Sequence, residues 1–260
     1  YGHDEALGAT PVAPAAVLRP RTTDEVAAIL RCCTEHRIAV TARGSGSGLS
    51  GACTPVAGGV VVSFERMNRI VEIDAPGGVA VVQPGVTLEQ LDAELAPLGV
   101  SYPVRPGEYS ASLGGNVNPN AGGMQAVKHG VTRHHVLGLE IVLPTGEVMR
   151  TGGRTVKSSS GYDLTQLVIG SGGPPALVTE GTLKLVPRLP RAATVLVPFT
   201  TLDEVSAALP RVLASGLTPT IKAQFEEAKA AGGGGGGGAA KDDDDTDAPP
   251  TGGVAAAGRP

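Results

Sequence analysis

Residues 43–51 read Arg-Gly-Ser-Gly-Ser-Gly-Leu-Ser-Gly and directly follow a predicted strand. Gly46, Gly48 and Gly51 satisfy the G-x-G-x-x-G spacing of dinucleotide-binding folds. Those folds need a helix to open at the end of the motif, so that its N-terminus faces the pyrophosphate. Here residues 54–59 read Thr-Pro-Val-Ala-Gly-Gly and lead into another strand. The stretch also lacks the Gly-Lys-Ser/Thr ending of a P-loop, so neither of these two nucleotide-binding folds is indicated.

The chemistry of this first glycine segment (residues 43–51) nevertheless suits an anion. A run of Gly and Ser allows successive backbone N–H groups to converge into an anion-binding nest, to which the serine hydroxyls add donors. Taken alone, the segment is equally compatible with an ordinary flexible surface loop. Its candidate ligand-binding residues are Arg43, Gly44, Ser45, Gly46, Ser47, Gly48, Leu49, Ser50 and Gly51.

A second stretch has the same character. Residues 106–116 read Pro-Gly-Glu-Tyr-Ser-Ala-Ser-Leu-Gly-Gly-Asn and run on to Asn-Ala-Gly-Gly at residues 120–123. Two Gly-Gly pairs with Asn amides between them again offer backbone donors and small side chains. Two such segments in one domain suit a dinucleotide with a pyrophosphate bridge. The candidates in this second glycine segment (residues 106–123) are Pro106, Gly107, Ser112, Gly114, Gly115, Asn116, Asn120, Ala121, Gly122 and Gly123.

Strand and helix patterns alternate around these segments. Turn signals at residues 75–78 and 144–146 separate Val- and Ile-rich runs and predict two hairpins. Further strands are expected at residues 38–42, 60–64, 176–186 and 194–199. Capping boxes, in which Thr is followed three residues later by Glu or Gln, predict helices after Thr22, Thr87 and Thr201. Hairpins in a mixed order favour an α+β fold over a doubly wound parallel sheet.

The bulk composition excludes several classes of protein. A net charge of −4 argues against nucleic-acid binding, and no apolar run approaches the roughly 18 residues of a membrane span. The chain opens at Tyr1 with neither Met nor a leader, so we expect no signal peptide and a missing natural N-terminus. Three cysteines, two of them adjacent at Cys32 and Cys33, form no disulfide framework and indicate reduced thiols in the cytoplasm.

Neither the histidines nor the acidic run indicates a metal site. If His134 and His135 lie in a strand they point to opposite sides, which is poor for joint ligation with His129. The run of Asp at residues 242–245 lacks the Gly and the terminal Glu of a calcium loop. It belongs to residues 228–260, where polyglycine and acidic residues cannot bury enough apolar area to fold. We therefore predict no metal and a disordered C-terminal tail.

Four motifs in order carry a family resemblance: ARGSGSGLSG, PGEYSASLGGNVNPNAGGMQAVKHGVTRHHVLGLEIVLPTGEV, RTGGRTVKSSSGYDLTQLVIGS and LVTEGTLKLVPR. Together they resemble the FAD-binding domain of the p-cresol-methylhydroxylase type (PCMH-type, vanillyl-alcohol oxidase-like). Within that family they are most similar to the branch of the glycolate oxidase FAD subunit and FAD-linked D-lactate dehydrogenase. The likeness extends from about residue 16 to residue 220.

The resemblance implies that FAD lies between two α+β lobes, with both glycine segments at its pyrophosphate and ribityl chain. It also implies that the backbone near Gly170, Ser171 and Val178 approaches the flavin and adenine portions. Relatives that attach FAD covalently use a His in the first segment. Ser47 and Gly48 stand in that segment and no His does, so non-covalent FAD is expected.

The activity implied is oxidation of a 2-hydroxy acid of the glycolate or D-lactate type to the 2-oxo acid, with hydride transfer to the flavin. An electron acceptor or partner subunit would then take the electrons, in the cytoplasm or at the inner face of the membrane. The family's catalytic groups come largely from a cap domain, and the likeness stops at about residue 222, so the catalytic residues stay unknown. Two other interpretations stay open: an accessory FAD-binding module that needs a partner chain, and a non-functional truncated product.

The sequence also departs from the family pattern. Residues 170–175 read Gly-Ser-Gly-Gly-Pro-Pro where the family typically has Gly-Ser-Glu-Gly-Thr-Leu. Two prolines remove two backbone donors, which puts the flavin contact there in doubt, although Pro is tolerated where a strand begins. The expected division is a lead-in at 1–15, the FAD-binding domain at 16–190, the start of a truncated cap domain at 191–227, and the tail at 228–260.

Overall fold

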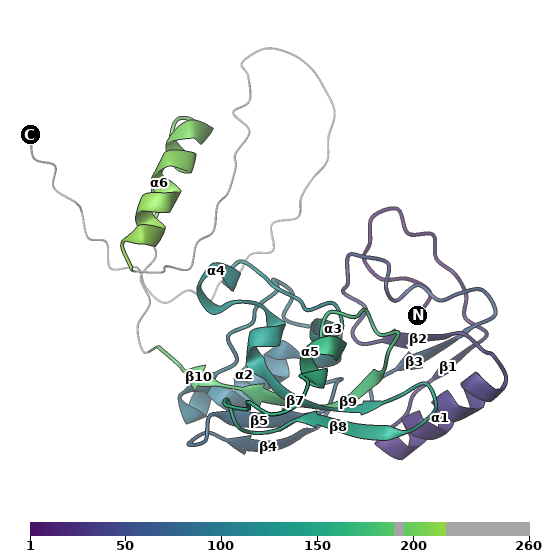
Figure 1. Cartoon of the computed structure of the whole chain (residues 1–260). Coiled ribbons are helices and arrows are strands. Elements are labelled where there is room, and N and C mark those ends of the chain that lie inside the picture. The colour runs from purple at the N-terminus through teal and green to yellow at the C-terminus, as the bar shows by residue number, and fades with distance from the viewer. Residues whose placement is uncertain (190–194, 217–260) are drawn as a thin grey trace, which may run out of the picture. The chain divides into compact units, whose positions relative to one another are not determined.

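The computed structural model describes residues 1–189 and 195–216. Its N-terminal part is a three-stranded parallel sheet in the order β1-β3-β2 with one long helix, α1 (Figure 1). All four residues of the middle strand are buried, as expected for a Val-rich parallel strand that has neighbours on both sides. The elements are β1 (Ala16–Leu18), α1 (Thr23–Glu35), β2 (Val40–Arg43) and β3 (Val60–Ser63).

The larger part is an antiparallel five-stranded sheet in the order β4-β5-β9-β7-β8. A hairpin turn joins β4 to β5 and another joins β7 to β8, whereas β9 arrives from far along the chain and inserts between the two hairpins. The strands are β4 (Ile70–Asp74), β5 (Val79–Val82), β7 (Val136–Val142), β8 (Val148–Gly152) and β9 (Leu177–Lys184).

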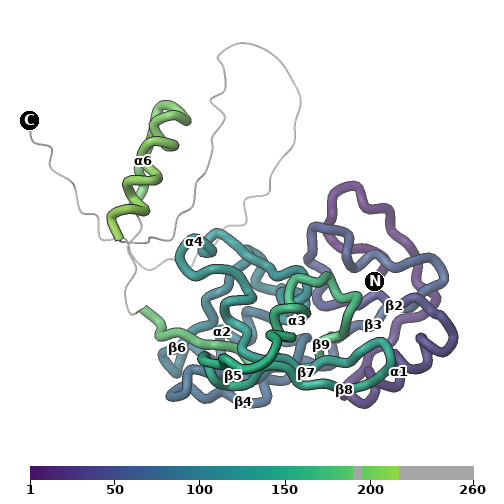
Figure 2. Tube along the Cα trace, viewed as in Figure 1, coloured from purple at the N-terminus to yellow at the C-terminus, as the bar shows by residue number. Residues whose placement is uncertain are grey.

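Helices α2, α3 and α5 lie over one face of this sheet, as Figures 1 and 2 both show. They enclose a core of aliphatic side chains that includes the fully buried Leu91, Leu95 and Leu183. The helices are α2 (Leu88–Leu95), α3 (Leu113–Val117) and α5 (Leu164–Val168). Short elements complete the description: η1 (Ala96–Leu98), β6 (Val100–Ser101), α4 (Ala126–His129), η2 (Thr132–His135), β10 (Val186–Pro187) and α6 (Leu202–Ala214).

A second core joins the two sheets. Val26 and Leu30 of α1 pack with Val62 of the parallel sheet and with Val142 and Leu177 of the antiparallel one. Val40 and Ala42 of β2, the strand from which the first glycine segment leaves, pack against this cluster.

Much of the predicted α+β organisation is confirmed, including both hairpins and the helices that follow the three threonines. Only the cap at Thr87 is a complete capping box, because the Glu25 and Glu204 carboxylates accept from the N–H groups of Arg21 and Thr200 instead.

Two local predictions are wrong. Residues 195–199, the described part of a predicted strand, form none, and His134 and His135 lie in the 3-10 helix η2 rather than in a strand. The predicted disordered tail, residues 228–260, lies outside the described residues. No helix within residues 1–189 and 195–216 is long and apolar enough to cross a membrane.

Candidate functional site

The first glycine segment begins where β2 ends and lies against the N-terminus of α3. The backbone N–H of Ser45 donates to Ser112 Oγ at 3.2 Å, and Ser45 Oγ donates to the carbonyl oxygen of Ser110 at 2.5 Å. The two segments that the sequence singled out are thus hydrogen-bonded to each other across more than sixty residues of chain. The Ser45 hydroxyl thus helps to hold this junction together.

Gly44 makes the approach of the two segments possible. A Cβ atom on Gly44 would lie 2.0 Å from Ser112 Oγ and 3.5 Å from the backbone nitrogen of Gly115. Any side chain there would push the first segment away from the turn of small residues that opens α3.

The two halves of the second glycine segment also lie together. A Cβ atom on Gly123 would be 1.8 Å from the carbonyl oxygen of Arg105, so residues 120–123 pack directly on the entry to Pro106 and Gly107. Asn120, the first residue of this stretch, has φ of 55°, a left-handed conformation that Asn tolerates better than most residues. Its side-chain Oδ1 accepts from the backbone N–H of Arg133 at 2.9 Å, which ties the segment to η2.

The structure also brings Gly170 and Ser171 to this place. The Gly170 N–H donates to the carbonyl of Val117 at 3.1 Å, and the Gly172 N–H donates to that of Asn118 at 2.9 Å. Gly170 has φ of 84° and lies so close to Asn120 that a Cβ would be 3.2 Å from the Asn120 Cβ. The chain then turns through Gly172 and Gly173, and the two prolines precede β9 rather than interrupt it.

Two asparagine side chains at this junction each have a buried polar atom without a hydrogen-bond partner. Among the described residues, Asn116 Nδ2 and Asn118 Oδ1 are shielded from solvent and lack a hydrogen-bond partner, as does Arg133 Nε. A buried polar atom without a partner costs about 1–3 kcal/mol. A polar ligand that supplied both donors and acceptors would recover that free energy, and a dinucleotide has both kinds of group, so these residues fit FAD.

Not every candidate lies at the junction. The Val178 side chain is 3% exposed within the core of the antiparallel sheet, so only its backbone is available to a ligand. The half of the first segment from Gly48 onward turns toward the N-terminal residues, because the Glu5 N–H donates to the Gly48 carbonyl at 2.9 Å. Leu49 is 77% exposed there.

Sequence reasoning missed three residues that organise the site: Asp4, Asn118 and Arg133. Asn118 lies in the Asn-rich run between the two Gly-Gly pairs, so the same amide argument could have included it. Arg133 connects three segments, since its N–H reaches Asn120, its guanidinium reaches the Ile169 carbonyl at 3.3 Å, and its own carbonyl accepts from Gln166 Nε2. Nothing in the sequence pattern marks Asp4.

Cys53, just beyond the first segment, is not a nucleophile in this setting. Burial raises the pKa of its thiol above the ordinary value; the nearby Arg43 lowers the pKa, whereas Asp4 raises it further. The thiol therefore stays protonated at neutral pH, and a thiolate is the reactive form.

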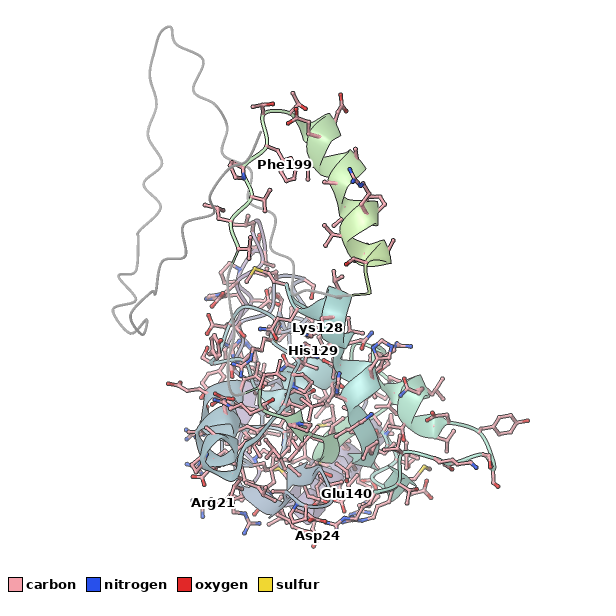
Figure 3. The ribbon with its side chains drawn as sticks, turned by 90° about the vertical axis from the view of Figure 1, so that its left-hand side faces the viewer. Arg21, Asp24, Lys128, His129, Glu140 and Phe199 are labelled. Atoms are coloured by element: carbon pink, nitrogen blue, oxygen red, sulfur yellow. The ribbon has the colours of Figure 1, made fainter. Side chains whose placement is uncertain are left out.

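The histidines do not form a metal centre. In the part of the chain that the structure describes, no three His, Cys, Asp or Glu side chains gather closely enough to hold a metal ion. His135 is buried and its Nε2 hydrogen-bonds the His129 carbonyl at 2.7 Å, whereas His134 is exposed and accepts from the Val131 N–H. Figure 3 shows His129 beside Lys128, on α4.

Comparison with known proteins agrees with this geometry. Residues 14–152 match the family described as "FAD binding domain". The chain belongs to this family, and its cofactor is FAD. The PCMH-type resemblance drawn from the four motifs is confirmed at this level.

Individual relatives extend the likeness. An uncharacterized FAD-linked oxidoreductase of Mycobacterium tuberculosis is 57% identical over 231 residues, which cover 89% of this chain and 50% of that protein. The glycolate oxidase subunit of Bacillus subtilis is 42% identical over 207 residues, covering 79% of this chain and 44% of that subunit. The chain thus spans about half the length of these curated relatives. A solved alkyldihydroxyacetonephosphate synthase has the same fold, with a TM-score of 0.64 at 23% identity over 78% of this chain and 40% of the synthase.

Proposed function

We propose that this chain is the FAD-binding part of an FAD-linked oxidoreductase, with the cofactor held non-covalently where the two glycine segments meet. The observation that carries the proposal is the contact between Ser45 and Ser112 beside the unpartnered amides of Asn116 and Asn118. One segment alone would pass for a surface loop. Two glycine-rich segments locked together, next to buried polar atoms that lack partners, suit a ligand that carries phosphate and hydroxyl groups.

Each part of the site has its own contribution. The glycines of both segments allow the backbone to approach the pyrophosphate closely, and Arg43 supplies positive charge at the start of the first segment. Gly170, whose N–H donates to the carbonyl of Val117, and Ser171, whose N–H donates to that of Val168, extend the binding surface beside Asn120. The first segment contains no His, and this supports non-covalent attachment.

The reaction we propose is the two-electron oxidation of a 2-hydroxy acid of the glycolate or D-lactate type to the 2-oxo acid. FAD supplies the hydride-accepting chemistry when it is bound. The residues of this chain bind and orient the cofactor. The support for a 2-hydroxy acid is the likeness to a glycolate oxidase subunit, which covers 44% of that subunit. We assign residues 16–190 to the FAD-binding domain, residues 191–227 to the beginning of a substrate domain, and no residue to the catalytic base.

An absorbance measurement tests the binding proposal. Protein purified in the presence of FAD and freed from excess cofactor should show flavin absorption near stoichiometry. Acid precipitation should release the colour into the supernatant, because the attachment is non-covalent. A protein that stays colourless after incubation with FAD contradicts the proposal, and colour that remains in the precipitate contradicts non-covalent attachment.

A second candidate function is a flavin-binding module that completes its active site with a partner chain, and its support is the likeness to a relative that is named as a subunit of glycolate oxidase. Anaerobic addition of glycolate or D-lactate to the yellow protein separates the two. Bleaching of the flavin absorption supports an enzyme that is competent by itself. A yellow protein that both acids leave unbleached supports the module.

A further inference from the structure

A buried carboxylate near the N-terminus, that of Asp4, lies against the first glycine segment. Asp4 is 4% exposed, although it lies in a short segment without helix or strand. Ionised side chains are rarely buried unless they are paired or hydrogen-bonded, because removing a carboxylate from water is costly. The position of Asp4 therefore calls for a structural explanation.

Both carboxylate oxygens of Asp4 accept hydrogen bonds from backbone N–H groups. Its Oδ1 accepts from the N–H of Ala6 at 3.1 Å, and its Oδ2 accepts from the N–H of Cys53 at 3.4 Å. The first bond shapes the N-terminal residues themselves, and the second reaches the exit of the first glycine segment, 49 positions along the chain. Asp4 also packs against the segment, since a Cβ on Gly48 would lie 3.3 Å from its Oδ2.

Other contacts hold the same N-terminal residues on the segment. The Glu5 N–H donates to the Gly48 carbonyl at 2.9 Å, and Arg43 donates to the His3 carbonyl at 2.5 Å. The Arg43 guanidinium lies so close to Gly46 that a Cβ there would be 2.0 Å from one of its nitrogens. We call residues 1–6 the N-terminal strap; Figure 1 shows the N-terminus beside β2, where the first segment begins.

The two halves of the first glycine segment are therefore fastened differently. Its first half is held by Ser110 and Ser112 of the second segment. Its second half is held by the strap, in which the buried Asp4 carboxylate accepts from the N–H of Cys53 just beyond the segment. Gly51, in this second half, has φ of 77°, and a Cβ there would meet no atom within 4 Å.

We propose that Asp4 is a positioning residue for FAD binding: its carboxylate fixes the second half of the first glycine segment in the conformation that receives the cofactor. The proposal rests on the proposed role of that segment in holding FAD. It assigns to the lead-in residues a function in the cofactor site, although Asp4 itself acts through the backbone of residues 48–53.

Two substitutions of Asp4 test this. Asp4→Leu removes both acceptors and keeps the same number and branching of side-chain heavy atoms, and Asp4→Asn removes the charge but keeps one acceptor oxygen. Glu94→Gln, at an exposed position on α2, matches the charge change of Asp4→Asn and serves as control. Each 260-residue variant is titrated with FAD while flavin fluorescence is followed, and amide exchange without FAD is read by mass spectrometry on peptides from residues 44–53 and from α1 and β5.

The expected result is a dissociation constant for FAD raised about tenfold or more in Asp4→Leu, in line with the loss of charge-assisted hydrogen bonds. Asp4→Asn should recover part of the affinity, and Glu94→Gln should bind as the unmodified chain does. Exchange in Asp4→Leu should accelerate in residues 44–53 while the peptides of α1 and β5 keep their protection.

Three results overturn the proposal: unchanged affinity in Asp4→Leu, exchange that accelerates equally in all three peptides, or unchanged exchange at residues 44–53. Exchange that accelerates equally in all three peptides would mean a general loss of fold. The milder variant Asp4→Asn then serves to compare exchange in residues 44–53 with exchange in the peptides of α1 and β5. If the unmodified chain fails to bind FAD, the proposed function falls. The exchange comparison still decides whether Asp4 positions the segment.

Discussion

The hydroxyl of Ser112 occupies the space that a side chain on Gly44 would need, so these two residues determine how closely the glycine segments meet. Ser112 Oγ accepts the Ser45 N–H, and the same oxygen would lie 2.0 Å from a Cβ on Gly44. The pairing of a serine with a glycine thus has a steric and a hydrogen-bonding reason. Neither reason can be read from spacing along the chain.

Gly44→Ala is the direct test of this contact. The added methyl group should displace Ser112 Oγ, break the bond to Ser45 and weaken FAD binding about tenfold or more, with a cost to stability of about 1–3 kcal/mol for overpacking. Isothermal titration with FAD and urea unfolding measure the two effects. Gly153→Ala is the matched control, because a Cβ there meets no atom within 4 Å; equal effects of both substitutions would refute the steric explanation.

His135, the last residue of η2, gives the protein a pH-sensitive position. The ring is 6% exposed and contacts Tyr102 edge to face, with ring centroids 6.2 Å apart. Burial lowers the pKa of His135 below its ordinary 6.5; the bond to the His129 carbonyl opposes this, and the nearby Lys184, His129 and His134 lower it further. The folded protein therefore holds His135 neutral at a pH where the unfolded chain already binds a proton.

Because the pKa of His135 is lower in the folded protein than in the unfolded chain, acid should destabilise the fold. The contribution of His135 to stability is fully present above pH 6.5, the ordinary value, and is lost as the pH falls toward the lower pKa of the folded state. Urea unfolding between pH 7.5 and 5 should show this loss, with a slope of at most about 1.4 kcal/mol per pH unit for one group. His135→Gln should reduce the slope, part of which remains because burial also lowers the pKa of His129. A slope that His135→Gln leaves unchanged would contradict this assignment.

At the scale of elements, the helix caps and hairpins could be predicted because they depend on residues a few positions apart. Thr87 and Gln90 satisfy each other's backbone donors, and the turn at residues 75–78 joins two strands that pair with each other. The two wrong predictions concern segments whose conformation depends on residues far away in the sequence. Residues 195–199 have strand-forming composition but no strand partner among the described residues, and η2 replaces a predicted strand start because its backbone is tied to Asn120 and Ala121.

Glu140 of β7 links four elements of the fold. Its carboxylate accepts from Thr23 at the start of α1 at 2.7 Å, from Thr179 of β9 at 3.0 Å and from Arg150 of β8 at 2.5 Å. The side chain is only 12% exposed, whereas Arg150 is 70% exposed and also reaches Glu180. Figure 3 places Glu140 near Asp24, also at the start of α1, and well away from Lys128.

Glu140→Ala should therefore destabilise the protein by about 1–3 kcal/mol. The Thr23 hydroxyl loses its acceptor and Thr179 keeps only the longer bond to the Glu140 carbonyl at 3.3 Å, while Arg150 keeps Glu180. Glu180→Ala removes the more exposed partner and should cost less than about 1 kcal/mol. Chemical denaturation followed by circular dichroism compares the two. A cost for Glu180→Ala as large as that for Glu140→Ala would contradict the role given to the buried contacts.

At the scale of the whole molecule, the two sheets are joined by one aliphatic cluster that includes Val26, Leu30, Val62, Met67 and Val142. The first glycine segment leaves the parallel sheet, and the second enters α3 over the antiparallel one. FAD held between the segments would therefore link the two sheets, and its binding should stabilise the whole described fold.

Thermal unfolding tests that expectation. FAD at about one hundred times its dissociation constant should add about 2.7 kcal/mol of stability. For a chain of this size that corresponds to roughly 5–10 °C in the midpoint. Circular dichroism at 222 nm follows the transition without interference from flavin fluorescence. At the same FAD concentration the shift in Gly44→Ala should fall to about half or less, because tenfold weaker binding leaves about 1.4 kcal/mol of stabilisation. A shift of equal size there would mean that FAD binds elsewhere.

The sequence by itself determined the two glycine segments, the hairpins, the helix starts and the family, because each is written in residues close together or in motifs of fixed order. Only the tertiary structure decided that Ser45 meets Ser112, that Gly170 lies beside Asn120, and that Asp4 is buried against Gly48. These contacts join positions tens of residues apart. Their formation depends on how the whole chain buries its apolar surface and closes its loops, which no local pattern of residues records.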